Sequence, residues 1–151
     1  MIAAACAGFL IAVLWMDLIF DSQVLRHRGT EELPEPVLSS ISAYYRRATT
    51  TSKPMSLLIA IVMVILLGTL GFAWISGPIV VWALVVASAL AAGPILLAML
   101  RTVPNAVRLG ARNGDVADQS RLARSVCIDH LVCLACLVAF LALWLATTAR
   151  T

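Results

Sequence analysis

Charged side chains are scarce in this sequence of 151 residues, of which Asp, Glu, Lys and Arg make up 13%. A soluble globular domain carries about twice that share of charge and a smaller apolar fraction than the 62% found here. One soluble core of this size could not bury so much apolar surface, and a disordered chain has the opposite composition. We therefore expect an integral membrane protein.

Several signatures of known chemistry are also missing. The chain has no P-loop, no G-x-S-x-G nucleophile elbow and no dinucleotide-binding fingerprint. It has neither H-x-x-H nor E-x-x-H, the spacings that place two metal ligands on one helix face. These absences argue against a nucleotide-driven machine and against a metal site.

What the sequence does have is four apolar runs of about 20 residues, at 2–20, 55–75, 79–100 and 126–147. A helix of that length spans roughly 30 Å, the thickness of the hydrocarbon core. None of the runs alternates as barrel strands do, and backbone groups in lipid must be paired within the segment. We predict an all-α fold: one membrane domain over residues 1–151, a four-helix transmembrane bundle. The first run lacks preceding basic residues and a following cleavage site, so we interpret it as a retained span.

Basic residues are distributed unevenly over the connecting segments. With four spans, residues 21–54 and 101–125 lie on the same side of the membrane, and they carry ten of the eleven basic residues. Only Arg150 falls on the other side. The positive-inside rule makes the basic side cytoplasmic. We expect a multi-pass protein of the inner (plasma) membrane with both termini outside, an external turn at Ser76-Gly77-Pro78 and no nucleic-acid partner.

The cytoplasmic segments show helical patterns. A short amphipathic helix is predicted after Pro36, because apolar side chains recur there at helical spacing. Its apolar positions are Val37, Leu38, Ile41, Tyr44 and Tyr45. In the second segment, Asn113-Gly114 indicates a turn and Asp115 an N-cap. Helix three should therefore continue to about residue 112, and helix four should begin near residue 116.

Small residues form a stripe on span three, at Ala83, Ala87 and Ala91. Side chains of this size let helices approach closely. The stripe is explained either by packing within the bundle or by self-association. A homo-oligomer is therefore one of two open interpretations, and contacts with membrane lipids are expected in both.

Polar residues converge near the cytoplasmic ends of the spans. Asp17 and Asp21 lie on one face at the end of span one, and Asp129 and His130 lie about one turn inside span four. Charged groups in the hydrocarbon are costly and need partners. A stripe on helix three supplies such partners: Arg101, Asn105, Arg108 and Arg112.

Two interpretations of this convergence are open. The charges form a structural lattice of salt bridges, or they line a polar pocket for a lipophilic small molecule. In the second case Asp129 or His130 is the general base, because burial and neighbouring charges move a pKa toward neutrality. The substrate-binding residues would be Trp15, Asp17, Asp21, Tyr44, Tyr45, Arg46 and Arg124.

Metal and redox sites are not expected. Asp129 and His130 point about 100° apart on a helix and cannot easily share an ion, so we predict no metal and no cofactor. Cys133 and Cys136 form a C-x-x-C inside span four, without the exposed helix N-terminus that activates such thiols. Four-span quinone reductases of the vitamin K epoxide reductase type need a second, external cysteine pair, which this chain lacks. We expect these thiols to pack in the core.

One stretch carries a family resemblance. Pro104-Asn105-Ala-Val-Arg108-Leu109 lies at the cytoplasmic end of the third of four short spans. In this it resembles the anthrone-oxygenase-like family of small bacterial and fungal membrane proteins, a likeness that covers the helix count and about six residues. The resemblance implies a four-helix bundle and, for some relatives, cofactor-independent oxygenation of polycyclic phenols.

The functional expectation follows from these patterns together. It is a small membrane enzyme, or an enzyme-like binder, acting on a lipophilic substrate. Asp129 or His130 would be the base, and Asn105 with Arg108 would hold a developing oxyanion. The alternative is a non-enzymatic interaction or assembly subunit whose charge cluster is structural.

Overall fold

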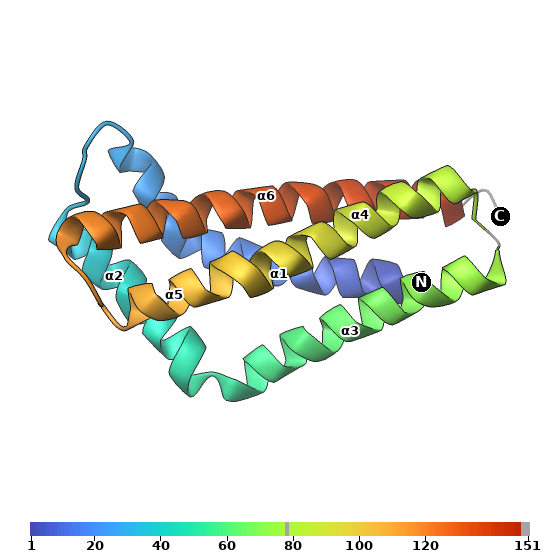
Figure 1. Ribbon diagram of the computed structural model, residues 1–151, viewed down its shortest axis with the longest axis horizontal. Coiled ribbons are helices and arrows are strands. Elements are labelled where there is room, and N and C mark those ends of the chain that lie inside the picture. Colours follow the sequence, from blue (N-terminus) through green and yellow to red (C-terminus); the bar gives the residue numbers. More distant parts are fainter. Residues whose placement is uncertain (78, 149–151) are drawn as a thin grey trace.

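The computed structural model describes residues 1–77 and 79–148, and these ranges contain helices and turns but no strand (Figure 1). Four helical stretches are long and apolar enough to cross a membrane: Ile2–His27, Lys53–Ser76, Val81–Gly110 and Val116–Thr148. The prediction of an all-α fold with four such helices is confirmed. Pro78 of the predicted external turn, Arg150 and the C-terminal residue lie outside the described residues.

The helices extend beyond the apolar runs from which they were predicted. The first stretch is α1 (Ile2–Asp21) followed by the 3-10 turn η1 (Ser22–His27), and α3 covers Lys53–Ser76. The third consists of α4 (Val81–Leu97), the π-helical turn η3 (Ala98–Thr102) and α5 (Val103–Gly110). The last, α6 (Val116–Thr148), begins where the sequence predicted helix four. Hydropathy marks only the apolar part of a helix, so it does not indicate where the polar extensions end.

The predicted amphipathic helix is present as α2 (Glu35–Arg46), followed by a π-helical turn η2 (Arg47–Thr51). Pro36 lies in its first turn, where the missing N–H costs no hydrogen bond. Leu38, Ile41 and Tyr45 are buried along one face. That face packs mainly on α5, so α2 closes one end of the bundle.

The predicted tip between helices three and four is also confirmed. Gly114 adopts a φ of 99°, and the Asp115 carboxylate accepts a hydrogen bond from the Asp118 backbone N–H at 2.8 Å. The preceding helix ends at Gly110 rather than at residue 112, because Arg112 has a left-handed φ of 53°. A non-glycine residue in that region cannot continue a helix.

Two apolar clusters lie at different levels of the molecule. The larger one joins α1, α3, α4 and α6 and includes Leu10, Leu70, Ala87 and Phe140. The smaller one joins η1, α2, α5 and the first part of α6, and it includes the fully buried Ile41. Along α6 the small cluster ends at Val126 and the large one begins at Leu137. Asp129 and His130, which are buried, fall in this gap, so a polar layer separates two apolar cores.

The helices contribute unequally to the core. Ala83, Ala87 and Ala91 of α4 are all buried within the chain, so this stripe serves packing inside the molecule rather than a free surface. By contrast, α3 has no buried residue before Leu66. Figure 1 shows α3 along the edge of the molecule, closer to α4 at its C-terminal end than at its start.

Candidate functional site

The polar layer contains a cluster of five side chains from α1, α2 and α6. Asp21, which is fully buried, accepts hydrogen bonds from Tyr45 Oη at 2.7 and 2.8 Å, one on each carboxylate oxygen. Nδ1 of His130 lies 2.6 Å from Oδ2 of the same carboxylate. The remaining members are Asp17 and Tyr44, and we refer to the five together as the Asp–His cluster.

Asp17 occupies the open side of this cluster. Its Oδ1 accepts a hydrogen bond from Tyr44 Oη at 2.5 Å, and its Oδ2 lies 3.9 Å from Nε2 of His130. Phe20 stacks on the Tyr44 ring at a centroid distance of 4.1 Å and holds the phenol in place. The imidazole of His130 thus lies between two carboxylates, one on each ring nitrogen.

The two tyrosines are fixed as hydrogen-bond donors. Burial and the neighbouring aspartates raise the pKa of Tyr44 and the pKa of Tyr45 well above the ordinary value of 10.0. Both phenols therefore stay protonated over the physiological range and donate to the carboxylates. The sequence placed Tyr44 and Tyr45 near Asp17 and Asp21, and the structure brings these four residues together.

Asp129 lies elsewhere, although it is adjacent to His130 in the sequence. Its buried carboxylate accepts a hydrogen bond from Thr102 Oγ1 at 3.3 Å and lies 3.4 Å from Nε of Arg101. Consecutive residues on a helix point about 100° apart, so the two neighbours serve different networks. Of the helix-three residues predicted to be partners of the buried charges, Arg101 is the one that contacts Asp129. An expected contact of Asp129 with Arg108, Arg124 or His130 is not formed.

The partners of Asp129 come from the π-helical turn η3. Such turns insert one residue into a helix and are frequent at functional sites. Here the turn begins four residues after Pro94, which lies inside α4. Thr102 was missed from the sequence because a threonine at the end of an apolar run carries no pattern of its own. The only available signals were its neighbour Arg101 and the prolines on either side.

Two adjoining pockets open beside the Asp–His cluster. The mouth pocket, of about 560 Å³, lies between α1, α2, η2 and the start of α3, and Tyr44, Arg47 and Ser52 line it. The deep pocket, of about 160 Å³, extends among α1, α3, α4 and α6 and is lined mainly by apolar residues such as Leu14, Met63 and Leu137. Six residues line both: Val13, Asp17, Ile59, Thr102, Val103 and His130. The two therefore form one elongated space, the joined pockets, with Asp17 and His130 at the junction.

Several predicted site residues lie away from this space. Trp15 is 64% exposed and borders a different hollow, so it does not wall the polar pocket. Arg124 donates hydrogen bonds to the backbone oxygens of Thr30 and Glu31, where it ties down the loop before α2. Arg46 is exposed, and its side chain has no hydrogen bond or ion pair with any residue that the structure describes.

The two residues that carried the family resemblance are also separate from His130. Asn105 donates to Ser125 Oγ at 3.3 Å, beside the Arg101–Asp129 pair. Arg108 is exposed and makes no side-chain hydrogen bond or ion pair within the described ranges. Neither is among the described residues that line the joined pockets. The structure thus does not assemble an oxyanion site from Asn105 and Arg108 around His130.

The cysteines and acidic residues form no further centre in the described part of the chain. All four thiols are free, and Cys6, Cys127 and Cys133 are buried. Cys133 Sγ donates to the Pro94 carbonyl at 3.8 Å and lines the deep pocket. Within residues 1–77 and 79–148, no group of three or more His, Cys, Asp or Glu side chains is arranged to hold a metal ion.

No protein-family model, curated protein or solved structure matches the chain. Inferences about function therefore depend on the geometry of the joined pockets.

Proposed function

We propose that the chain is a four-helix bundle of the inner membrane that binds a lipophilic molecule in the joined pockets, with His130 as the proton acceptor for chemistry on its polar end. One observation carries this proposal. Asp17 and His130, two ionisable side chains, line both the deep apolar pocket and the mouth pocket, which is the more polar of the two. Buried ionisable groups bordering an apolar cavity are typical of functional sites in membrane proteins.

The orientation follows from charge. Ten of the eleven basic residues lie in the two connections at the end closed by α2 and α5. That end faces the cytoplasm if the positive-inside rule holds. The mouth pocket then opens at the headgroup level of the inner leaflet, and the deep pocket lies in the hydrocarbon. A molecule with an apolar body in the deep pocket and a polar end in the mouth pocket matches this change from hydrocarbon to headgroups.

The geometry supports a base at His130. With Asp21 as a carboxylate, Nδ1 of His130 carries a proton and donates to it at 2.6 Å. That tautomer leaves the lone pair on Nε2, which faces Asp17 and the pockets. Asp17 would stabilise the imidazolium formed on proton transfer. A carboxylate that orients a histidine from behind is a common arrangement for general-base catalysis.

The reaction implied by the family resemblance is compatible with this chemistry. His130 would remove a proton from the acidic CH₂ group of an anthrone, and the carbanion would react with O₂. The CH₂ carbon becomes a carbonyl carbon, and one molecule of water is released for each O₂ consumed. Asn105 and Arg108 have no part in this proposal, because they lie outside the pockets.

Binding is tested with a pair of isoleucine variants on α3. Ile59 lines both pockets, whereas Ile61 is exposed and is not among their described lining residues. The probe is 1,8-dihydroxyanthrone, added to detergent-solubilised protein and followed by its fluorescence and, under air, by the absorbance of the anthraquinone product. We expect Ile59→Trp to abolish binding and Ile61→Trp to retain it, with His130→Gln binding the probe without converting it. Equal binding by the two tryptophan variants would refute the pocket assignment.

The structural alternative also has an observation in its favour. Among the described residues, Gln119 Oε1 and Trp144 Nε1 are the only buried side-chain nitrogen or oxygen atoms without a hydrogen-bond partner, so the Asp–His cluster is internally satisfied. Replacing a satisfied buried ion pair by apolar residues is often neutral or stabilising. If the cluster is only structural, the triple change Asp21→Leu, His130→Leu and Tyr45→Phe, which leaves no buried donor unpaired, should keep the thermal stability and lose no measurable binding.

A further inference from the structure

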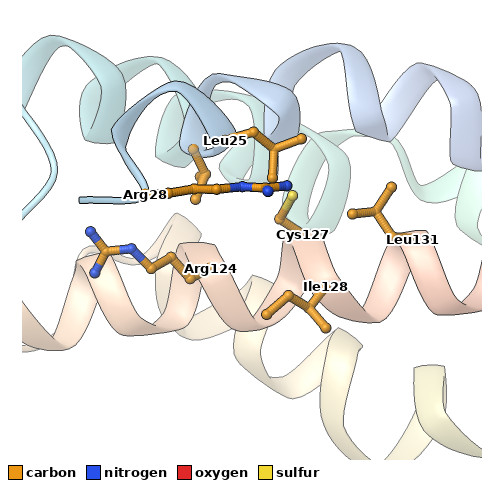
Figure 2. Close-up of a pocket in the computed structure, with 7 residues that line it drawn as sticks. Leu25, Arg28, Arg124, Cys127, Ile128 and Leu131 are labelled. Atoms are coloured by element: carbon orange, nitrogen blue, oxygen red, sulfur yellow. The ribbon is translucent and has the colours of Figure 1, made fainter. Parts of the chain in front are cut away.

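A second concave surface lies on the outside of the molecule, between the α1–η1 stretch and α6. Its first part, of about 280 Å³, is bordered by Arg28, Arg124, Cys127 and Ile128 (Figure 2). An adjoining hollow of about 320 Å³ continues along the same two elements past Leu18 and Leu134 to Trp15. Leu25 and Leu131 line both parts. The two hollows therefore form one elongated groove, which we refer to as the outer groove.

The two ends of the outer groove differ in chemistry. One end has two arginines, and the other is apolar apart from Ser22 and the indole N–H of Trp15. Figure 2 shows the Arg28 side chain extended along the groove with its guanidinium group beside Cys127, while Arg124 points the opposite way. Arg124 is held by the backbone oxygens of Thr30 and Glu31, at 2.6 and 2.8 Å.

Neither arginine has an acidic partner among the described residues. Arg28 makes no hydrogen bond or ion pair within residues 1–77 and 79–148, and Arg124 contacts only carbonyl groups. Two uncompensated positive charges thus lie at one end of an apolar groove. A guanidinium group with free N–H donors matches a phosphate oxygen pair in geometry and charge.

The walls of the outer groove face away from the protein core. Trp15, Ile19 and Ile128 are 64%, 52% and 55% exposed. In the membrane orientation proposed above, these side chains contact acyl chains, and Arg28 lies near the cytoplasmic headgroups. Charge at headgroup level above an apolar groove complements an amphiphile with an anionic head and a long apolar tail.

We propose that the outer groove binds an anionic phospholipid of the inner leaflet, with its phosphate on Arg28 and one acyl chain along Leu25 and Leu131 toward Leu18. Arg124 adds positive charge and holds the loop that borders the headgroup end. This inference depends on the membrane placement of the chain but not on the ligand or chemistry of the joined pockets.

The test measures lipid retention by native mass spectrometry. The protein is reconstituted in bilayer discs of equal parts phosphatidylcholine and phosphatidylglycerol, and the lipids that remain bound after release are counted. Wild type should retain phosphatidylglycerol in preference to phosphatidylcholine. Arg28→Gln should lower the retained phosphatidylglycerol about fivefold to tenfold, the loss expected for one arginine at an anionic headgroup. Arg26→Gln is the matched control, since Arg26 is exposed on the same turn and is not among the residues that border the groove.

A second pair of variants tests the acyl-chain part. Leu131→Trp should fill the groove and lower retention of phosphatidylglycerol, whereas Val132→Trp, one exposed position further on, should not. The proposal would be overturned if wild type retained the two lipids equally. It would also be overturned if Arg28→Gln or Leu131→Trp retained as much phosphatidylglycerol as wild type. Displacement of phosphatidylglycerol by an equal concentration of glycerol phosphate would also overturn it, because the site would then bind a soluble anion. An impermeant-label test of membrane orientation reports separately on the placement of the chain.

Discussion

At the scale of single residues, Asp21 has the most demanding environment among the described carboxylates. It is fully buried, and it accepts one hydrogen bond from Tyr45 Oη, shared between its two oxygens, beside the contact with Nδ1 of His130. A carboxylate can accept on both oxygens, whereas an amide has one acceptor oxygen and an NH₂ group. The sequence identifies Asp21 as a charge near the end of span one, but which side chains donate to it, Tyr45 and His130, depends on how α2 and α6 pack against α1.

Replacement of Asp21 by Asn should therefore destabilise the fold. The new NH₂ group would face a donor from either Tyr45 or His130, leaving a buried donor unpaired. We expect a loss of about 2–4 kcal/mol, measured as a lower midpoint of thermal unfolding in detergent. Ser22→Asn, one exposed position further on, is the control and should unfold like wild type. An unchanged midpoint for Asp21→Asn would contradict the hydrogen-bond network described for the Asp–His cluster.

The same reasoning separates Asp129 from the proposed chemistry. Asp129 contacts Thr102 and the half-exposed Arg101 and is not among the described residues that line the joined pockets. Asp129→Asn keeps an oxygen for Thr102 and weakens only the contact with Arg101. We expect a change in stability of at most about 1 kcal/mol and unaltered binding of the anthrone probe. If this variant lost probe binding while its midpoint of thermal unfolding stayed unchanged, Asp129 would belong to the binding site.

The residue scale also shows the limit of sequence patterns. Depth in the membrane is predictable, because it follows from counting residues along each span, and it placed Asp17, Asp21 and His130 at one level. Direction around a helix is less predictable. The two π-helical turns change the direction around the helix axis in which the following side chains point. No sequence pattern in 47–51 or 98–102 predicts that change. Thr102 therefore could not be assigned to Asp129 in advance, and Arg101 was only one of four candidate partners on helix three.

At the scale of elements, the contact between α2 and α5 positions the tyrosines of the Asp–His cluster. The two helices meet at Gly110, where an added Cβ would lie 2.8 Å from the Arg46 backbone N and 3.0 Å from the Tyr45 carbonyl carbon. These are backbone atoms of α2, so they cannot make room for a Cβ unless the whole helix moves. The sequence predicted α2 from its periodicity, but nothing in it indicated that a glycine on α5 would be the point of closest approach.

Gly110→Ala should accordingly push α2 away from α5. Overpacking of this kind costs about 1–3 kcal/mol, and we expect thermal unfolding to begin at a lower temperature. Gly68→Ala is the matched control, since nothing lies within 4 Å of its added Cβ and alanine favours the helix. A Gly110→Ala variant as stable as Gly68→Ala would show that α2 and α5 are not in contact in the membrane.

A surface ion pair joins the start of α2 to the residue after α5. Arg112 donates to Glu35 at 2.9 Å, and this hydrogen bond lowers the pKa of Glu35 below its ordinary value of 4.5. An acid with a lowered pKa in the folded state stabilises the fold above its unfolded pKa, and the stabilisation is lost as the pH falls through the folded pKa. The contribution is small, because both side chains are exposed and screened by salt.

The pH dependence of this pair can be measured by comparing wild type with Glu35→Gln. The difference between their unfolding midpoints should be present at pH 6 and should be lost as the pH falls below 4.5 and through the lowered pKa of Glu35 in the folded state. It should also decrease in 1 M salt. Glu32→Gln serves as control, since the Glu32 side chain makes no hydrogen bond or ion pair with the residues described. A difference that persists at pH 3 would rule out the ion pair as its cause.

At the scale of the whole molecule, the orientation proposed from the basic residues can be tested directly. In a background with the four native cysteines replaced, Ser76→Cys lies at the end of α3 and Gly29→Cys in the loop after η1. We expect an impermeant maleimide to label Ser76→Cys in intact cells and Gly29→Cys only after permeabilisation. The reverse result would invert the topology, and with it the leaflet assigned to the outer groove.

The global architecture was the part most accessible from the sequence. Four apolar runs of bilayer length, an amphipathic segment and an Asn-Gly turn each depend on local composition, so they predict helices without tertiary information. The division of the interior into two apolar cores with a polar layer between them was only partly visible, because it needs the pairing of Val24 and Leu33 with α5 and α6. Pockets depend on gaps between packed helices, and no pattern along one chain encodes them.

The uneven packing of α3 has a consequence for how a ligand would be exchanged. Its first half has no buried residue and borders the joined pockets at Ile59, while Leu57, Leu58 and Ile61 are exposed on its other sides. In the proposed orientation, a molecule dissolved in the bilayer reaches the pockets by sliding past this half-helix without crossing water. Occupancy would then be set by the mole fraction of the ligand in the lipid phase rather than by its aqueous concentration. Two compounds with equal affinity for the pockets would saturate the protein at aqueous doses that differ by the ratio of their partition coefficients.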